Sequence, residues 1–230
     1  MQGLGRRREP GFALLEGPRV VAEAAAAGVE LEVLAVREGD DYDVEASLRI
    51  TLSRSLFRSI SQTVTPQGVL AIAKVREATA SEAIAAAHAR RWPLVVLDRV
   101  QDPGNVGAIV RSAAAAGAPA IAVLEGCADP FGAKSVRASA GNVFRLTVAR
   151  ADWDELAGLD GYGAAAAGGA PLDESPIENA GMIVLGSEAH GLSHSNLKLV
   201  TIPITEGVES LNVAAAAALL LFEVSRRRAA

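Results

Sequence analysis

Asn105, Gly107 and Arg111 are residues of the types that bind polar ligands, and they stand just after an apolar run at 94–97. The run predicts a strand over 94–98, and the apolar spacing beyond it predicts a helix opened by Asn105. Gly107 leaves the first turn bare, and Arg111 lies on the same face four residues later. Because α/β proteins place ligands where a strand leads into a helix, the stretch predicts a ligand site, with a nucleotide as the first candidate.

In two later segments, too, an expected strand leads into a loop that can bind a ligand. The first runs from an expected strand over 182–186 into a glycine-flanked turn that carries one carboxylate, Glu188. The second is an expected strand over 200–204, followed by a loop and a helix over 211–227. Pro203 has no N–H, so its strand must lie at a sheet edge or leave the pairing there. Exposed backbone groups at such places can bind a ligand.

Strands and helices alternate from residue 94 onward, which predicts an α/β fold with a mainly parallel sheet covered by helices on both faces. Residues 1–75 predict a small α/β domain, residues 76–92 a connecting helix or linker, and residues 93–230 the second domain. The expected strands of the second domain cover 94–98, 120–124, 143–148, 162–167, 182–186 and 200–204.

The composition of the chain bears on its cellular compartment and on the cofactors that it can bind. Half of the 230 residues are hydrophobic, enough for a substantial core. The single cysteine, Cys127, cannot form an internal disulfide, and with the three histidines it shows no metal-ligand spacing. The longest apolar run, 213–222, is about half of the ~20 residues that a membrane span needs. No secretory signal is visible, so we expect a cytoplasmic protein with no metal and no membrane partner.

The net charge of −5 is unevenly distributed. Nine basic and four acidic residues lie within 49–111, whereas 152–188 holds eight acidic residues and no basic one. The basic region includes an expected helical stretch with Arg49, Arg54 and Arg58. This pattern permits a phosphate-facing surface on an acidic protein, and solvated faces that happen to segregate are the alternative.

Common nucleotide and hydrolase motifs are missing from the sequence. No GxxxxGK[ST] exists, which excludes a P-loop ATPase, and no Ser-His-Asp pattern is visible. The glycines at 104 and 107 lack the third glycine and the acidic residue of the dinucleotide fingerprint. A nicotinamide enzyme of the Rossmann type is therefore kept only as an alternative.

Three signatures in order resemble those of the SpoU (TrmH-type) family of RNA 2′-O-ribose methyltransferases, which belong to the SPOUT class. They read NxGxxxR at 105–111, GxExxGL at 186–192 and IPI…SLNV from 202 to 213. The stretch 134–141 resembles the segment between the first two signatures, and residues 1–75 look like the RNA-binding domain of many members. The resemblance implies a C-terminal trefoil knot, an S-adenosylmethionine pocket and a homodimer formed through the methyltransferase domain.

The resemblance also assigns roles by matching position, with the 2′-hydroxyl of rRNA, or of tRNA, as the implied methyl acceptor. The residues assigned to catalysis, on the side of the site that faces the ribose, would be Asn105, Arg111, Glu188, Ser210 and Asn212. The cofactor would lie against Leu185, Gly186, Gly191, Ile202, Ile204, Ser210, Leu211 and Val213. RNA would be bound by Arg49, Arg54, Arg58, Arg111, Lys134 and Arg137. The chain departs from the family in Ala189, where a glycine is frequent, so the turn should be stiffer.

Arg111 is cast as the base in this family, yet a guanidinium with a pKa above ~12 accepts a proton poorly. We expect Arg111 to hold a phosphate and to stabilise the developing alkoxide. Simpler roles exist for the other residues: Asn105 and Ser210 could be helix caps, and Glu188 an ordinary turn carboxylate. An RNA-binding protein of the same fold without catalysis is the second alternative.

Overall fold

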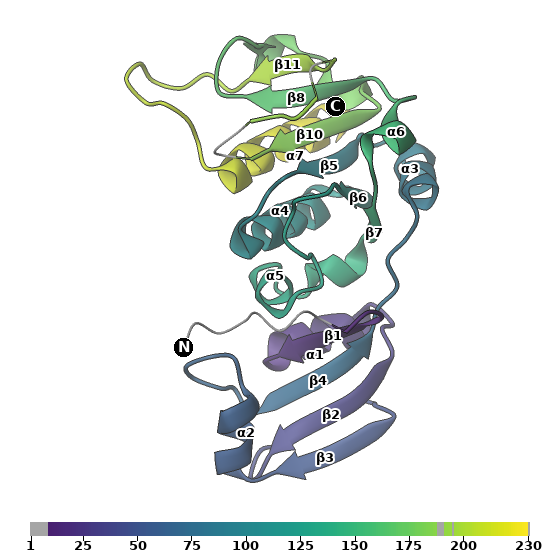
Figure 1. The fold of residues 1–230 in the computed structure, drawn as a ribbon, viewed down its shortest axis with the longest axis vertical. Helices are drawn as coiled ribbons and strands as arrows, with labels where there is room; N and C mark the ends of the chain where they lie inside the picture. Colours follow the sequence, from purple (N-terminus) through teal and green to yellow (C-terminus); the bar gives the residue numbers. More distant parts are fainter. Residues whose placement is uncertain (1–8, 188–190, 195, 230) are drawn as a thin grey trace.

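The computed structural model describes residues 9–187, 191–194 and 196–229, and it contains two sheets placed one above the other along the longest axis (Figure 1). The N-terminal sheet has four strands and the C-terminal sheet has seven. The C-terminal sheet and its helices agree with the α/β fold class that the sequence predicts.

The N-terminal sheet is mixed. β4 pairs antiparallel with β1 and β2, and β3 pairs parallel with β2. Helix α1 (Pro18–Ala26) covers one face, and α2 (Arg54–Ile60) buries Phe57 against the other. Arg49 lies on β3 and not in a helix as expected, because its β-branched neighbours at 50 and 51 suit a strand paired with β2. The strands are β1 (Phe12–Glu16), β2 (Leu31–Arg37), β3 (Leu48–Leu52) and β4 (Val69–Lys74), in the order β1-β4-β2-β3.

The C-terminal sheet is parallel at every pairing. The inner strand β5 is buried at all five positions, as expected of a strand covered on both faces. The order of the strands is β7-β6-β5-β10-β8-β11-β9. Their bounds are β5 (Leu94–Asp98), β6 (Ala120–Val123), β7 (Thr147–Arg150), β8 (Gly161–Ala165), β9 (Ala170–Pro171), β10 (Met182–Gly186) and β11 (Lys198–Thr201).

Helices cover both faces of this sheet. Alternate residues of β5 and β10 divide between two apolar clusters, one beneath α4 and α7 and the other beneath α3. The helices are α3 (Ala80–Ala89), α4 (Pro103–Ala116), α5 (Ala133–Ala138), α6 (Trp153–Leu156) and α7 (Val213–Ala229). Three short 3-10 turns complete the fold: η1 (Asn142–Arg145), η2 (Leu172–Glu174) and η3 (Ile177–Asn179).

Several expected bounds were wrong. Residues 142–145 form η1 after the left-handed Gly141 (φ 82°), so the strand expected over 143–148 is β7 over 147–150. The strand expected over 200–204 ends at Thr201, two residues before Pro203, which cannot donate to a ladder. The last helix begins at Val213 instead of residue 211. The two-residue strand β9 was missed, since so short a segment has no periodicity.

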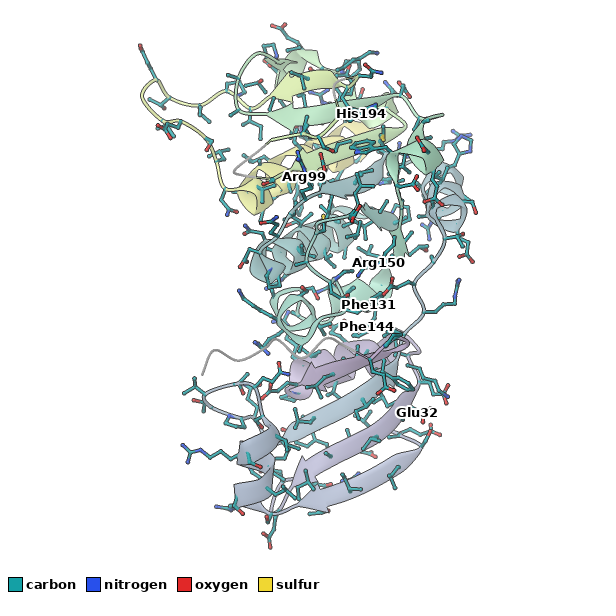
Figure 2. The ribbon with its side chains drawn as sticks, viewed as in Figure 1. Glu32, Arg99, Phe131, Phe144, Arg150 and His194 are labelled. Carbon is teal, nitrogen blue, oxygen red and sulfur yellow. The ribbon has the colours of Figure 1, made fainter. Side chains whose placement is uncertain are left out.

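The two sheets share one continuous core. The Phe131 and Phe144 rings, 6.2 Å apart, lie close to the junction with the N-terminal sheet (Figure 2). Arg145 of η1 pairs with Glu23 of α1 at 2.6 Å. These contacts fix the N-terminal sheet against the α5 and η1 side of the C-terminal unit, so the two parts have one defined relative placement.

Candidate functional site

A cavity of about 540 Å³ opens at the carboxyl ends of β8, β10 and β11. This is the place where open parallel sheets bind ligands. Most of the lining is aliphatic, with three polar side chains, Ser187, His194 and Ser210. The lining consists of Ala164, Ala165, Ala166, Gly186, Ser187, Gly191, Leu192, His194, Leu197, Leu199, Val200, Ile202, Ile204, Ser210, Leu211, Val213 and Ala216.

A tight turn after β10 forms one wall. The N–H of Ser187 donates to the Gly191 carbonyl at 3.2 Å, and the N–H of Gly191 donates back to the Ser187 carbonyl at 2.8 Å. A Cβ on Gly186 would lie 2.6 Å from the Gly191 oxygen, and Gly191 itself has a φ of +61°. Both glycines are therefore required by the turn. Glu188 and Ala189, which the sequence analysis also singled out, lie outside the described residues.

A buried carboxylate fixes the far side of this turn. Asp98, at the end of β5, is 1% exposed and accepts hydrogen bonds from the Ser193 N–H at 2.5 Å and the Ser193 hydroxyl at 2.9 Å. Arg99, with a positive φ of 56°, donates to the Gly191 carbonyl at 3.4 Å. The Trp153 indole donates to the Ser193 hydroxyl at 2.9 Å and its ring stacks on His194, which lines the cavity. Asp98 thus holds the wall formed by residues 191–194.

Two asparagines meet where α4 and α7 begin. The Asn212 Nδ2 donates to the Asn105 Oδ1 at 3.2 Å, across 107 positions of sequence. The Asn212 Oδ1 accepts from the N–H groups of Ala214 at 2.9 Å and Ala215 at 3.4 Å. Asn212 is therefore the N-cap of α7, and the assignment of that role to Ser210 was wrong. Ser210 lies two residues earlier and lines the cavity.

Asp102, and not Asn105, caps α4. The Asp102 side chain accepts from the Asn105 N–H at 3.0 Å, and its second oxygen pairs with Lys134 at 3.0 Å. Lys134 and the Asn105 N–H lower the pKa of this carboxyl below its ordinary value. Because Asp102 caps the helix, the Asn105 side chain does not, and its Oδ1 accepts the hydrogen bond from Asn212.

Gly107 has a different role from the one expected. The sequence suggested that it leaves space for a ligand, but a Cβ there would overlap the Ser135 carbonyl and lie 2.5 Å from the Ala138 Cβ. Gly107 allows α5 to approach α4 closely. Arg111, one turn further along α4, is exposed, and no side chain in the described ranges pairs with its guanidinium.

The other cations expected to bind RNA fall into two groups. Arg49 pairs with Asp41 at 2.7 Å. Arg137 lies 3.8 Å from the buried Glu16, so part of its guanidinium faces inward. Arg54 and Arg58 on α2 are exposed and have no ion-pair partner in the part of the chain that the structure describes.

Comparisons with known proteins identify the family to which the chain belongs. The family model "SpoU rRNA Methylase family" matches residues 93–222, more than half of the chain. The chain belongs to the SpoU rRNA methylase family. A model named "MRM3-like substrate binding domain" matches residues 5–71.

Relatives of this SpoU chain match over nearly its whole length. The Bacillus subtilis 23S rRNA (guanosine(2553)-2′-O)-methyltransferase RlmP is 34% identical, over 92% of this chain and 87% of its own. The structure of the SpoU methyltransferase AviRb from Streptomyces viridochromogenes, in complex with AdoMet, covers 95% of this chain and 91% of its own (TM-score 0.79, 26% identity). A TrmH-family protein from Porphyromonas gingivalis covers 94% and 90% (TM-score 0.74, 30% identity).

For this SpoU chain, seven of the eight residues expected to lie against a cofactor do line the cavity; the exception is Leu185, which is fully buried in the core. Ten lining residues were not among those expected to bind the cofactor: Ala164, Ala165, Ala166, Ser187, Leu192, His194, Leu197, Leu199, Val200 and Ala216. The run 164–166 carried a usable signal, because it ends a strand of a parallel sheet. His194 carried none, since its place depends on the Trp153 stack.

The described residues of the SpoU chain contain no group of three or more His, Cys, Asp or Glu side chains placed to hold a metal. Among the same residues, no helix has the length and apolar character needed to cross a bilayer.

Proposed function

We propose that this chain transfers a methyl group from S-adenosylmethionine to a ribose 2′-hydroxyl of ribosomal RNA. The observation that carries the proposal is the convergence of three segments: the turn after β10 and the start of α7 line one apolar cavity, and the Asn105–Asn212 hydrogen bond joins the start of α4 to the start of α7. RlmP supports the choice of rRNA, and the AdoMet complex of AviRb supports the cofactor.

The cavity fits S-adenosylmethionine in size and character. Small-molecule pockets are mainly apolar concavities of about 300–1,000 Å³ with a few polar groups, and this one is of that kind. When bound, the cofactor supplies a methyl group on a positively charged sulfur. The aliphatic lining excludes water, which favours a reaction in which that charge is lost. Residues proposed to hold it are Gly186, Gly191, Ile202, Ile204, Ser210, Leu211 and Val213, with Leu185 supporting them from the core.

On the ribose side we assign positioning and electrostatic roles. Asn105 is oriented by its hydrogen bond with Asn212, and we assign it to the ribose side. Arg111 is exposed, and its guanidinium stays protonated, so it suits an RNA phosphate and the developing 2′-oxyanion. Glu188 is proposed to orient Arg111. Holding the two reactants in line can supply ~7–11 kcal/mol of the acceleration.

The architecture that we propose includes a C-terminal trefoil knot and a homodimer. The similarity of fold to AviRb over 95% of the chain supports the knot, together with a path that leaves the sheet after β11 and returns to α7 beside α4. Leu219 and Phe222, half exposed on α7, support a dimer through the methyltransferase domain. We further propose residues 1–75 as the RNA-binding domain, 76–92 as the connection and 93–230 as the catalytic domain.

The alternatives are less favoured. An inactive RNA-binding protein has no need of the aliphatic cavity together with Asn105, Arg111 and Asn212. A nicotinamide enzyme of the Rossmann type is contradicted by the family match.

Two measurements test the function. Calorimetric titration should show binding of S-adenosylmethionine and none of NADH. Methylation of ribosomal RNA with labelled cofactor, followed by mass-spectrometric mapping, should show a 2′-O-methyl group at a defined nucleotide. Label in a base or in no RNA at all would refute the proposal.

A further inference from the structure

A second hollow, far from the cofactor cavity, opens in the N-terminal unit between α2 and the loop over 61–68. Its volume is about 770 Å³. The lining includes three arginines, from β2 and α2, beside an apolar wall and floor. These residues are Arg37, Arg54 and Arg58, with Phe57, Val64 and Pro66.

The loop that forms the wall is held in place at both ends. The Glu16 carboxylate accepts from the Gln62 N–H at 3.1 Å, the Thr63 N–H at 3.2 Å and the Thr63 hydroxyl at 2.6 Å. At the other end, the Tyr42 hydroxyl donates to the Gln67 carbonyl at 2.9 Å. Between these anchors Val64 is 97% exposed. Because the loop is fixed, the Val64 side chain is held in solvent, and packing an apolar group against it would remove apolar surface from water.

The charges in the hollow suit a phosphate. Arg37 is neutralised by Asp40 at 2.7 Å, but Arg54 and Arg58 are exposed and no acid in the described ranges pairs with them. Guanidinium groups bind phosphate oxygens by two parallel hydrogen bonds. A concave site with cations on one side and an aliphatic wall on the other fits a single nucleotide, whereas the stacked bases of a duplex offer no face to such a wall.

The hollow is also tied to the catalytic unit. Glu16, the last residue of β1, holds the loop and also lies 3.8 Å from Arg137 of α5. Lys134, on the same helix as Arg137, pairs with Asp102 at the start of α4. In Figure 1, α2 and the loop over 61–68 lie on the same side of the molecule as the chain over 203–211. One RNA could therefore contact both places.

We propose that this hollow binds one unpaired nucleotide of the substrate RNA, with its phosphate on Arg54 and Arg58 and its base against Val64 and Pro66. The inference rests on the proposed function, which makes RNA the substrate. Its role is to select RNA in which an unpaired nucleotide lies at a fixed distance from the methylated ribose.

The first experiment measures binding of a 12-nucleotide oligouridylate and of a 12-base-pair RNA duplex by fluorescence anisotropy at several salt concentrations. We expect the R54A/R58A variant to bind the oligouridylate at least ten-fold more weakly, with a salt slope smaller by about 1.4, since each phosphate contact contributes about 0.7 for single strands. Val64→Asp should weaken oligouridylate binding several-fold and leave duplex binding unchanged. Arg19→Ala, on α1 at the opposite face of the sheet, is the control for loss of one exposed cation elsewhere on the same unit and should change neither.

A second experiment uses oligouridylate that contains 4-thiouridine. Photo-crosslinking should attach it to the peptide that contains residues 54–66. Equal losses for the two RNAs in R54A/R58A, no effect of Val64→Asp, or crosslinks elsewhere would overturn the proposal. These outcomes are separable from failure of the proposed function, because the wild-type protein would still methylate rRNA and every variant would still bind S-adenosylmethionine.

Discussion

Arg111 is the residue on which the proposed chemistry depends most. It is exposed on α4, one turn beyond Gly107, and no described side chain neutralises it. An exposed cation with no ion-pair partner among the described residues contributes little to stability, so Arg111 has little structural purpose.

We expect Arg111→Ala to reduce kcat for rRNA methylation by at least 100-fold, since removal of one group that stabilises a developing oxyanion has effects of about 10²–10³. The dissociation constant for S-adenosylmethionine and the melting temperature should stay unchanged. Arg111→Lys should recover only part of the rate, because an ammonium cannot form the bidentate contact. Full activity of the alanine variant in a labelled-methyl assay would contradict the assignment.

Asn212 combines a helix cap with a contact to the site, and two substitutions separate these roles. Asn212→Asp keeps the capping oxygen but loses the Nδ2 donor to Asn105, so we expect near-normal stability and at least a ten-fold loss of activity. Asn212→Ala loses both, and its free energy of unfolding should fall by ~1 kcal/mol. Urea unfolding and methylation rates measure the two effects. Equal loss of stability in both variants would show that the amide donor acts on the fold.

At the scale of elements, the site is formed by the ends of strands and helices held by a few buried polar contacts. The wall over 191–194 has little regular structure, and Asp98 secures it from the end of β5. Two backbone hydrogen bonds between Ser187 and Gly191 fix the start of this wall to the end of β10. The shape of the cofactor cavity therefore depends on a carboxylate that does not line it.

We expect Asp98→Ala to weaken S-adenosylmethionine binding by about ten-fold or more and to lower the free energy of unfolding by ~1–3 kcal/mol, since the Ser193 N–H is left without its acceptor. Asp98→Asn retains one acceptor oxygen and should recover part of the affinity. Calorimetry gives the affinity, and KM for RNA, which the loop does not touch in this proposal, should stay constant. An unchanged cofactor affinity in Asp98→Ala would show that the loop is held by other contacts.

The end of α7 provides a pH-dependent element. Arg226 and Arg227 lower the pKa of Glu223 to about 2, and Arg227 also donates to the carbonyls of Leu172 and Ser175 in the segment before β10. A folded pKa below the unfolded value of about 4.3 means that the stabilisation is complete above pH 4.3 and is lost as the pH falls toward 2. Glu223→Gln cannot ionise, so this variant lacks the stabilisation at every pH. In urea unfolding, the variant should be less stable than the wild type at pH 6, and the difference should shrink at pH 3.

At the scale of the whole molecule, two units share one core, and a ligand for one has a fixed position relative to the other. Ion pairs Arg145–Glu23 and Arg137–Glu16 cross the junction between the units. The outer face of α7 stays partly uncovered, with Leu219 and Phe222 half exposed. Apolar side chains of this size in one patch mark a contact surface.

We expect the wild-type protein to sediment as a dimer and the Leu219→Glu/Phe222→Glu variant to sediment as a monomer. Circular dichroism should be unchanged, because both side chains lie on the outer face of the helix. Val208→Glu, a similarly exposed apolar residue in the loop before α7, serves as the matched control and should stay dimeric. A wild-type monomer in sedimentation velocity would refute the proposed assembly.

The sequence by itself determined the alternation of strands and helices, the three signatures and seven of the 17 residues that line the cofactor cavity. These are local properties: apolar spacing, glycines in turns and a proline that ends β11 are visible in short windows. The tertiary structure alone decided that Asn105 meets Asn212, that Gly107 serves the packing of α5, and that Arg137 faces Glu16. Each of these depends on which distant segments come together, and no local spacing encodes a contact across 107 residues.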